Sequence, residues 1–594
     1  MNFILQRLQL PDTACPIPRM YYTGEGFLLS QDGAKIVFAP GGWVKGDTYF
    51  NSFSLGKWKK YTSLDKLALR IKAKGAFRVS VYGISFKNCE VSKENKCEQL
   101  IAEQSLAGTG DRHEELAIPD CDFEDELIVW QFTALECGCE LYAADYVGTS
   151  DTPLHEVRLA IGICTYKREE YLQANLAQLA AGILDNEKSP LHGRVRVFIS
   201  DNAETLPPSG HPDIHVFPNP NLGGAGGFTR CLIEAKFRSD FHPTHIILMD
   251  DDVLLRIGTF EYLYAFLSME KTEHADAMIG GALFYQDEPN RQYVGGEFLE
   301  FDNWKPQRHN LDMRLFKNVF ANEYASAEVS YNGWWFCCIP ETYVAKTNLP
   351  LPIFLHFDDK EYPIRHRVRF IHLNGVCVWH PRFSNKQATA TLGYYNNRNA
   401  YIFMAETAPE RLTVKYLLGM LIRGLKSTLY YRYEMGFLQM RAIDDFLKGI
   451  DAFEHTDPLK LHAELSEFND QWIPWEGDPE QLLKIGKRRR SLKEAFKMSL
   501  NCFLPAIRKP REYRYAATYP GVFLKKGITI VDTTKGVGTT YHKDFRKFIR
   551  NLRYFFDVLF ELKKTKPIVW EWNRRIGEVQ SLDFWEKYLD LKQF

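Results

Sequence analysis

The stretch HIILMDDDVLL, residues 245–255, decides the predicted fold. Four apolar residues run into three consecutive carboxylates, Asp250, Asp251 and Asp252, and a second apolar run follows. A short continuous apolar run is typical of a strand that is buried on both faces of a parallel sheet. Three adjacent carboxylates at the end of such a strand repel one another and lose hydration, so they need a cation or hydrogen-bond donors nearby.

The order of the three carboxylates also indicates where they point. Side chains alternate along an extended chain, so Asp250 and Asp252 are expected to point the same way while Asp251 points elsewhere. Such a pair can hold a hard divalent cation, because Mg²⁺ typically takes one or two protein carboxylates and completes its shell with phosphate oxygens and water. Taken alone, the stretch would also fit a solvated acidic turn.

The composition limits the class of protein. At 594 residues the chain is too long for one hydrophobic core, so two to four domains are expected. The net charge of -1 gives no support for a nucleic-acid partner. The N-terminus lacks a basic region before an apolar one, and no run of roughly 18 apolar residues occurs, so neither a secretory signal nor a membrane-spanning helix is expected. Twelve scattered cysteines without repeated C-x-x-C pairs favour a reduced, cytoplasmic chain.

Residues 1–150 are predicted to form an antiparallel β-sandwich of the jelly-roll kind. Aromatic and β-branched runs, such as FRVSVYGIS from Phe77 and ELIVWQFTAL from Glu126, are divided by Gly, Asn and Asp. Short strands at this spacing are typical of sandwiches. Such a domain could bind carbohydrate, but a structural or substrate-guiding role is the simpler interpretation.

Residues 151–405 are predicted to form a doubly wound, Rossmann-like α/β domain. VRLAIGICTYKRE from Val157 and VRVFISDNAE from Val195 are apolar runs that end in polar turns, and helical sequence separates the strands. Ligands of such sheets bind at the carboxyl ends of the strands. Arg168, Asp201 and the three consecutive aspartates all lie at such ends.

A glycine-rich segment, NPNLGGAGGFTR, covers residues 219–230 between the second and third of these strands. Four glycines in five residues allow close backbone approach, and backbone amides at such a loop suit a diphosphate. No Lys-Ser or Lys-Thr pair follows the glycines, so the loop is not a P-loop, and its spacing is not the dinucleotide fingerprint. A tight turn and a phosphate contact both remain open.

Three later motifs add candidate residues. YNGWWFCCIP contains Trp334 and Trp335, and adjacent tryptophans are more often core than ligand platform. FLHFDDKEYPIRHR carries a second acidic pair, Asp358 and Asp359, which supplies a carboxylate that is free to act as a general base. VCVWHPRF is a strand that ends in His380, and neutral imidazole is a suitable third ligand for Mn²⁺ or Mg²⁺.

Residues 406–594 are predicted to be helical to the end. The segment 543–562 has Lys and Arg on one face and Phe, Ile and Leu on the other, which is the pattern of a helix that lies on an anionic membrane surface. The cluster KIGKRRR, ending at Arg490, would add to that attraction. A helix docked on the protein with a solvated basic face explains the same pattern.

Taken in order, the motifs CTYKR, SDNA, NPNLGGAGGFTR, MDDD, GWWFCCIP, FDDKEY and VWH resemble the family 2 glycosyltransferases of GT-A fold. The resemblance is closest to the bacterial UDP-galactofuranosyltransferases that polymerise galactan. It covers most of the chain, because that family also has an N-terminal β-sandwich and a helical C-terminal region. It implies an inverting, metal-dependent transfer of galactofuranose from UDP-galactofuranose to a bacterial surface glycan such as galactan, O-antigen or capsule.

By position, the resemblance assigns a role to each candidate residue. Asp359 becomes the catalytic base, and the metal ligands for Mn²⁺ or Mg²⁺ become Asp250, Asp252 and His380. The uridine diphosphate is assigned Arg168, Asp201, Asn221, Gly224, Asp251 and Arg398. The sugar and the acceptor are assigned Trp334, Trp335, Asp358 and Glu297. Phe357 and Lys360 depart from the family pattern beside the second acidic pair, which bears on the identity of the acceptor more than on the chemistry.

The resemblance also implies partners: a nucleotide-sugar donor, a glycan acceptor carried on a lipid, an anionic membrane surface and a second copy of the chain. The place it implies is the cytoplasm or the cytoplasmic face of the inner membrane. One alternative is a transferase of the same fold that uses another nucleotide sugar, such as dTDP-rhamnose. Another is a noncatalytic carbohydrate-binding scaffold, which predicts loss of metal or base residues that this sequence retains. A metal-dependent phosphotransferase or nucleotidyltransferase would leave Asp359, the two tryptophans and His380 without a joint explanation.

Overall fold

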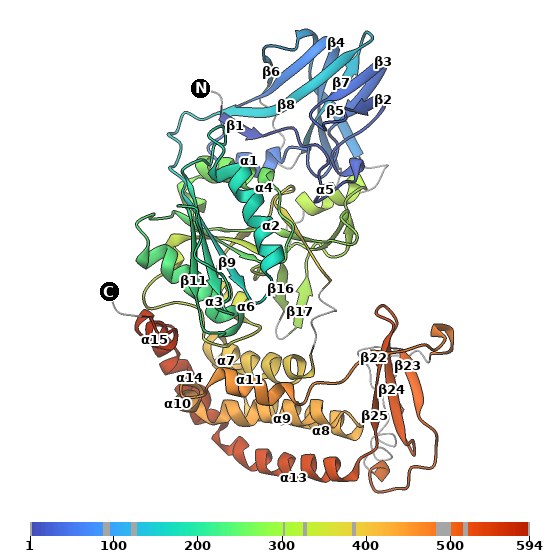
Figure 1. Cartoon of the computed structure of the whole chain (residues 1–594), viewed down its shortest axis with the longest axis vertical. Coiled ribbons are helices and arrows are strands. Elements are labelled where there is room, and N and C mark those ends of the chain that lie inside the picture. The colour runs from blue at the N-terminus through green and yellow to red at the C-terminus, as the bar shows by residue number, and fades with distance from the viewer. Residues whose placement is uncertain are drawn as a thin grey trace. The chain divides into compact units, whose positions relative to one another are not determined.

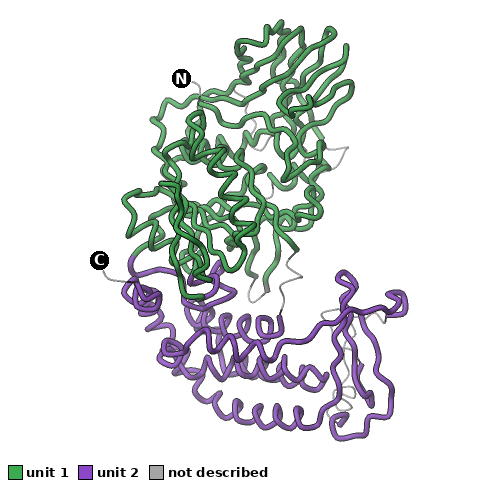
Figure 2. Tube along the Cα trace, in the orientation of Figure 1, with its two compact units in different colours: residues 1–221, 227–345, 362–382 green, residues 222–226, 346–361, 383–594 purple. Residues whose placement is uncertain are grey.

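The computed structural model of the chain forms two compact units. It describes residues 3–86, 96–119, 127–300, 303–324, 329–382, 388–482, 500–514 and 521–591. The first unit consists of residues 1–221, 227–345 and 362–382, and the second of residues 222–226, 346–361 and 383–594 (Figure 2). The cluster KIGKRRR lies outside the described residues.

The N-terminal part of the first unit is an eight-stranded sheet (Figure 1). Its strands are β1 (Phe3–Gln6), β2 (Thr23–Leu29), β3 (Ile36–Lys45), β4 (Lys66–Phe86), β5 (Lys96–Thr109), β6 (Glu114–Ile118), β7 (Leu127–Ala134) and β8 (Cys139–Thr149). All of their pairings are antiparallel. Their buried rings pack edge to face, as Phe77 does against Phe38 and Phe132. The predicted N-terminal β-rich region is confirmed.

A seven-stranded mixed sheet forms the centre of the first unit, in the order β11-β10-β9-β12-β19-β13-β20. Its strands are β9 (Leu159–Thr165), β10 (Val195–Asp201), β11 (Ile214–Pro218), β12 (His245–Asp250), β13 (Met278–Gly280), β19 (Phe336–Pro340) and β20 (Phe370–Ile371). Strands β9 to β12 are mutually parallel, whereas β19 runs antiparallel to β12. The apolar residues 246–249 of β12 are completely buried, as a strand covered on both faces requires. The predicted α/β class is confirmed.

Smaller sheets and helices complete the part of the chain before residue 382. The strands are β14 (Ala282–Tyr285), β15 (Arg291–Val294), β18 (Leu311–Asp312) and β21 (Cys377–His380) in one sheet, and β16 (Glu297–Glu300) with β17 (Asn303–Pro306) in a hairpin. The helices are α1 (Leu55–Tyr61), α2 (Glu169–Leu179), α3 (Gly223–Ile233), α4 (Ile257–Met269), α5 (Phe316–Tyr324) and α6 (Asp358–Arg365). Helix α3 packs closely on β9, because a Cβ at Gly162 would lie 2.8 Å from the Cβ of Cys231.

Helices dominate the second unit (Figure 1). They are α7 (Asn396–Thr407), α8 (Val414–Leu429), α9 (Tyr433–Leu447), α10 (Gly449–Glu454), α11 (Pro458–Ser466), α13 (Phe545–Glu561), α14 (Thr565–Arg575) and α15 (Leu582–Tyr588). Helix α13 packs on α8 and α9 through the buried residues Phe548, Asn551 and Phe555. Among the helices that the structure describes, none combines the length and the apolar character that a membrane crossing needs.

The C-terminal region also contains a sheet, which corrects the prediction that it is helical to the end. Strands β22 (Ile473–Pro474), β23 (Arg511–Arg514), β24 (Gly527–Asp532) and β25 (Val537–His542) form it in the order β22-β25-β24-β23. The sequence GITIVDTTKGVGTTYH is rich in β-branched residues around a turn in which Gly536 has a φ of 65°. That is the pattern of a hairpin, which the helical prediction overlooked.

Candidate functional site

Strand β12 brings the first carboxylates to the edge of the central sheet. In register with β9, Asp250 lies opposite Cys164, and Asp201 of β10 lies opposite Thr165 at the end of the same strand. Three parallel strands therefore end at one edge, where doubly wound sheets bind their ligands. Asp251 follows in the turn after β12 and is only 3% exposed.

Asp250, Asp252 and His380 converge at this edge. Each offers one ligand atom, and these atoms all lie within 4.8 Å of one another. The Nε2 atom of His380 lies 3.2 Å from Oδ1 of Asp252 and 3.9 Å from Oδ2 of Asp250. The Nδ1 atom of the same ring faces the carbonyl oxygen of Pro381, which leaves Nε2 toward the carboxylates. The predicted convergence of these three residues is confirmed, and their role as ligands stays a prediction.

A backbone bridge explains how residues so distant in the sequence meet. The amide of Leu254 donates to the carbonyl of Trp379 at 2.8 Å, and the amide of Trp379 donates back at 3.1 Å. Because Trp379 precedes His380 in β21, the turn after the aspartates is fastened beside the histidine. The indole of Trp379 is completely buried and donates to the carbonyl of Pro289 at 2.9 Å, which fixes β21 in turn.

Arg168 and Thr165 hold Asp251 on the other side of the turn. Nη1 of Arg168 lies 2.9 Å from both Oδ1 of Asp251 and Oδ2 of Asp252, and the Thr165 hydroxyl donates to Asp251 at 2.8 Å. Burial raises the pKa of Asp251 although Arg168 opposes the shift, whereas the two carboxylates outweigh burial and raise the pKa of Arg168. Asp251 is thus engaged by Thr165 and Arg168 and is not one of the three residues whose ligand atoms gather. Thr165 was not predicted, although it lies inside the CTYKR motif.

Asp201 and Asn221 were predicted to contact the uridine diphosphate. The carboxylate of Asp201 is almost fully buried and accepts the amide of Ala203 at 3.0 Å and those of Thr205 and Leu206 at 2.7 Å each. These hydrogen bonds close the turn after β10, and both oxygens of the carboxylate accept backbone amides. Asn221 is half-buried ahead of α3. Their roles toward a nucleotide stay predictions.

The glycine-rich segment forms the first turns of α3, and close packing explains its glycines. Gly223 has a φ of 69°, and a Cβ there would lie 2.0 Å from the carbonyl oxygen of Phe354. A Cβ at Gly227 would lie 2.1 Å from the sulfur of Cys164. At Gly224 a Cβ would lie 3.1 Å from Oδ2 of Asp358, which is tight but tolerable. A phosphate contact at Gly224 stays a prediction.

Trp334 and Trp335 are mostly core residues, as the more common role of such pairs suggests. They are 4% and 8% exposed. The indole of Trp335 donates to the carbonyl of Gly281 at 2.8 Å, and the ring of Trp334 lies edge-on to Phe228 with centroids 5.4 Å apart. Contact of either ring with an acceptor stays a prediction.

Glu297 begins the hairpin of β16 and β17, and Tyr331 orients it. The Tyr331 hydroxyl donates to Oε2 of Glu297 at 2.5 Å, and the Glu297 amide donates to the Tyr331 carbonyl at 3.0 Å. The ring of Trp304 lies edge-on to Tyr331 with centroids 5.0 Å apart. Tyr331 was not predicted, but it opens the YNGWW motif and could have been found there.

Asp358 and Asp359 begin helix α6 after an unusual loop. Phe354, His356 and Phe357 have φ values of 72°, 63° and 76°, in the left-handed region that bulky residues avoid. Each such residue costs on the order of 1–2 kcal/mol, so other contacts must hold the loop. Asp358 is buried and Asp359 is half-buried. The two carboxylates also stand in the first turn of α6, where the helix dipole stabilises negative charge.

Asn399 and Arg398 of helix α7 hold this loop. The amide group of Asn399, a residue 1% exposed, donates to the carbonyls of Ile353 at 3.1 Å, Leu355 at 2.7 Å and His356 at 3.0 Å. Nη2 of Arg398 donates to the Ile353 carbonyl at 3.0 Å and to Oδ1 of Asn399 at 2.8 Å. Arg398 thus supports the loop, and its predicted contact with a diphosphate stays a prediction. Asn399 was missed, although it directly follows the candidate residue Arg398 in the sequence.

Comparison with known proteins identifies similar sequences. Residues 5–148 match the family model described as galactofuranosyltransferase 2 N-terminal. A galactofuranosyltransferase named GlfT2 from Mycobacterium tuberculosis is 28% identical over 433 residues, which covers 68% of this chain and 64% of that protein. The chain therefore aligns with slightly less than two thirds of that relative's length. GlfT2 from Mycolicibacterium smegmatis is 27% identical over 484 residues, covering 75% of this chain and 71% of that protein.

Solved structures add little. A family 29 carbohydrate-binding module covers 25% of this chain with 16% identity and a TM-score of 0.16, too low to support any argument. The family model instead matches residues 5–148, and the two relatives cover 68% and 75% of the chain. The resemblance that the seven motifs predicted is confirmed, and the chain is similar over most of its length to galactofuranosyltransferases.

Proposed function

We propose that this chain is an inverting, metal-dependent glycosyltransferase of GT-A fold. It would transfer galactofuranose from UDP-galactofuranose to a growing bacterial surface glycan such as a galactan. The observation that carries the proposal is the cluster of Asp250, Asp252 and His380 at the carboxyl edge of the central sheet. The similarity to galactofuranosyltransferases supports the choice of sugar.

The cluster of Asp250, Asp252 and His380 offers ligand atoms that suit a hard or borderline divalent cation. Two carboxylates and one neutral imidazole favour Mn²⁺ over Mg²⁺, although both accept such ligands. When bound, the cation would neutralise the negative charge that develops on the departing UDP. Arg168 would support this role, because its guanidinium already neutralises Asp251 and one oxygen of Asp252.

Asp359 is the proposed general base. It would take the proton of an acceptor hydroxyl while that oxygen attacks the anomeric carbon from the face opposite UDP, which inverts the configuration. A base must stay apart from the metal, because coordination would remove its basicity. The separation of the two acidic pairs in the sequence and their different supports are consistent with that requirement.

The remaining candidate residues divide between donor and acceptor. For the uridine diphosphate we propose Arg168, Asp201, Asn221, Gly224, Asp251 and Arg398. For the sugar and the acceptor we propose Trp334, Trp335, Asp358 and Glu297. Glu297 is the best supported of the second set, because Tyr331 fixes its carboxylate with one oxygen left to meet a hydroxyl.

A transfer assay tests the proposal. The full chain is incubated with Mn²⁺ and a lipid-linked synthetic acceptor, and UDP-galactofuranose, UDP-galactopyranose and dTDP-rhamnose are supplied in separate reactions. Mass spectrometry should find the acceptor extended by hexose with UDP-galactofuranose only, and chelation of Mn²⁺ should stop the reaction. Extension with dTDP-rhamnose alone would favour the alternative donor, and extension with none of the three would contradict the proposal.

We also propose that the chain attaches peripherally to an anionic membrane surface through α13, since its acceptor would be carried on a lipid. Phe545, Phe556 and Phe560 are 53%, 48% and 69% exposed on this helix, and the basic residues Arg546 and Arg553 are exposed as well. Exposed rings beside positive charges are typical of interfacial helices. Sedimentation with phosphatidylserine vesicles tests the idea: binding should fall in Phe560→Ser and should not differ from wild type in Leu28→Ser, which changes an exposed apolar residue of β2 in the first unit.

A further inference from the structure

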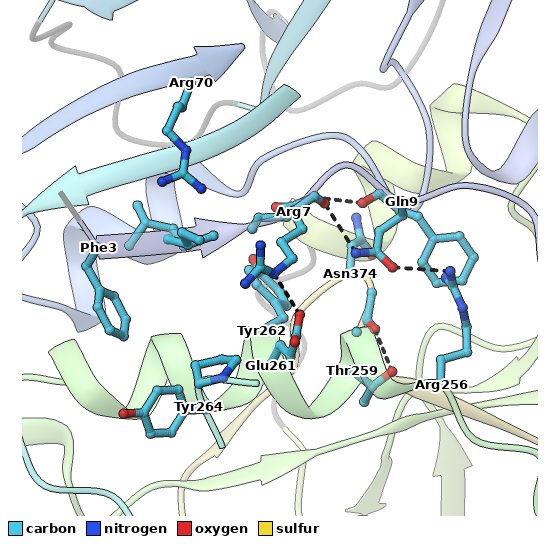
Figure 3. Close-up of a pocket in the computed structure, with 17 residues that line it drawn as sticks. Phe3, Arg7, Gln9, Arg70, Arg256, Thr259, Glu261, Tyr262, Tyr264 and Asn374 are labelled. Atoms are coloured by element: carbon cyan, nitrogen blue, oxygen red, sulfur yellow. Dashed lines mark hydrogen bonds and ion pairs between the residues drawn. The ribbon is translucent and has the colours of Figure 1, made fainter. Parts of the chain in front are cut away.

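A cavity of about 250 Å³ lies between strand β1 and helix α4, within the first unit (Figure 3). It exceeds the roughly 30 Å³ of one water several times and falls just short of the roughly 300 Å³ of the smallest typical ligand pockets. Its size therefore suits one small ring rather than a nucleotide sugar. None of the residues proposed above for metal, donor or acceptor lines it.

The charged side chains around the cavity are already paired. Nε of Arg7 lies 3.0 Å from Glu261, and Nη2 of Arg70 lies 3.0 Å from Asp145. Arg256, which also lines the cavity, pairs at 2.5 Å with Asp12, which does not. Figure 3 shows the side chain of Arg7 pointing toward Glu261, with their contact drawn as a dashed line. Because each cation has its anion, the cavity carries no excess charge that would select a phosphate or a metal ion.

Two polar atoms of opposite kind remain without a partner. Gln6 is 8% exposed, and its Nε2 donates to the carbonyls of Phe50 at 2.7 Å and Ser52 at 3.2 Å, which fixes the amide orientation. Among the residues that the structure describes, no group donates to Oε1 of Gln6, and none accepts from Nε of Arg70. A buried acceptor and a buried donor both without partners cost free energy, and a hydroxyl group can satisfy either.

Aromatic side chains supply the rest of the wall. Phe50, Tyr262 and Tyr264 are 3%, 6% and 8% exposed, and Phe3 lies at β1 against Tyr264 with ring centroids 6.1 Å apart. Aromatic rings pack against the C–H faces of a sugar, and hydrogen-bond donors and acceptors bind the hydroxyl groups at its rim. We propose that this cavity binds one uncharged sugar residue of a glycan, at a site separate from the metal cluster. The choice of galactofuranose as that sugar rests on the function proposed above.

Photocrosslinking locates the site. The full chain is irradiated with a diazirine-bearing methyl β-galactofuranoside, and labelled peptides are identified by mass spectrometry. We expect label in residues 3–9 and 256–264. An excess of methyl β-galactofuranoside should remove this label. Label confined to residues around 331–335 would overturn the inference, and so would label at the cavity that the galactofuranoside fails to displace.

Arg70→Lys tests the chemistry with the smallest change. It keeps the positive charge beside Asp145 and removes the unpartnered Nε, so labelling at the cavity should fall roughly tenfold. Arg19→Lys is the control, because Arg19 pairs with Asp47 outside the cavity and should leave labelling unchanged. Gln6→Leu should reduce labelling as well, and its melting temperature shows whether it folds. Equal labelling of wild type and Arg70→Lys would overturn the inference.

The transfer assay keeps this inference separate from the proposed function. A chain that transfers no sugar but is labelled at the cavity in an Arg70-dependent way contradicts the proposed function alone. A chain that transfers galactofuranose but shows no such label contradicts the cavity site alone.

Discussion

The first acidic cluster, Asp250 to Asp252, and the second acidic cluster, Asp358 and Asp359, are held in place by different means. A buried strand in register with its neighbours delivers the first, and an arginine and a histidine surround it. A loop with three left-handed residues delivers the second, and side chains from a helix some forty residues later hold that loop.

The difference matches the chemistry that each cluster would perform. Metal ligands need fixed spacing, which a sheet edge provides, and cationic neighbours lower the cost of gathering carboxylates. A general base needs a carboxylate that is neither coordinated nor fully paired. The contacts that hold this loop go to its backbone carbonyls. Separate substitutions in the two clusters should therefore affect metal binding and proton removal separately.

Replacing the proposed base should have the largest effect. Asp359→Asn should lower kcat roughly 1,000-fold, since the amide cannot take a proton, while the affinity for Mn²⁺ and UDP stays near that of wild type. Asp583→Asn is a control in the same unit, at an exposed position of α15. Wild-type turnover in Asp359→Asn would exclude it as the base, and lost Mn²⁺ affinity would mean that the two clusters are not separate in function.

Replacing a proposed metal ligand should weaken the Mn²⁺-dependent binding of UDP. Asp252→Asn should weaken Mn²⁺-dependent binding of UDP roughly 100-fold in calorimetric titrations, because one of two carboxylate ligands is lost. Asp240→Asn, an exposed residue that pairs with Arg196, is the matched control. A titration curve that is the same with and without the substitution would reject the metal assignment.

Removing the loop support should have a moderate effect on the second cluster alone. Asn399→Ala removes the donor to three carbonyls and should lower kcat roughly tenfold and the free energy of unfolding by about 2 kcal/mol. Asn397→Ala is the control, because Asn397 bonds only the carbonyls of Leu392 and Gly393. The two variants should differ in kcat and not in Mn²⁺ affinity; equal kcat values would show that the loop needs no such support.

At Glu270, burial outweighs the opposing positive charge of Arg369. Burial, together with the charge of Asp276, raises the pKa of Glu270 from its ordinary value of 4.5 to about 8. The folded state therefore holds a proton that the unfolded state releases, so this contribution to stability is complete below pH 4.5 and is lost as the pH rises toward 8. From pH 6 to pH 7 the loss should be about 1 kcal/mol in urea unfolding. Glu270→Gln should remove that slope, and an unchanged slope would contradict the shifted pKa.

The sequence was sufficient for the parts of the site that depend on strand order. Apolar runs that end in polar residues predict parallel strands, and the parallel strands of one sheet end at one edge, so Asp201 and Asp250 are expected at the same edge. The approach of His380 depends on the bridge between Leu254 and Trp379, which involves only backbone atoms and leaves no sequence signal.

Other parts were beyond prediction for physical reasons. The left-handed residues before Asp358 are bulky, so no glycine marks them, and their support from Asn399 is a contact between distant segments. Strands β24 and β25 were missed because the surrounding helical pattern outweighed a short β-branched run. The proposed sugar cavity lies where β1 meets α4, so its two walls are remote in the sequence.

Arg256 joins the turn after the aspartates to the N-terminal part of the first unit. This guanidinium sits four residues after Asp252, is paired with Asp12, and lies over the rings of Phe50 and Tyr21 at 4.4 Å and 4.9 Å. A gene fragment that starts after residue 150 would lose Asp12, Phe50 and Tyr21 and would leave this guanidinium and the apolar surface beside it open to water. Such a fragment should be recovered from cells as insoluble aggregate, because the surface that residues 1–150 cover would be exposed.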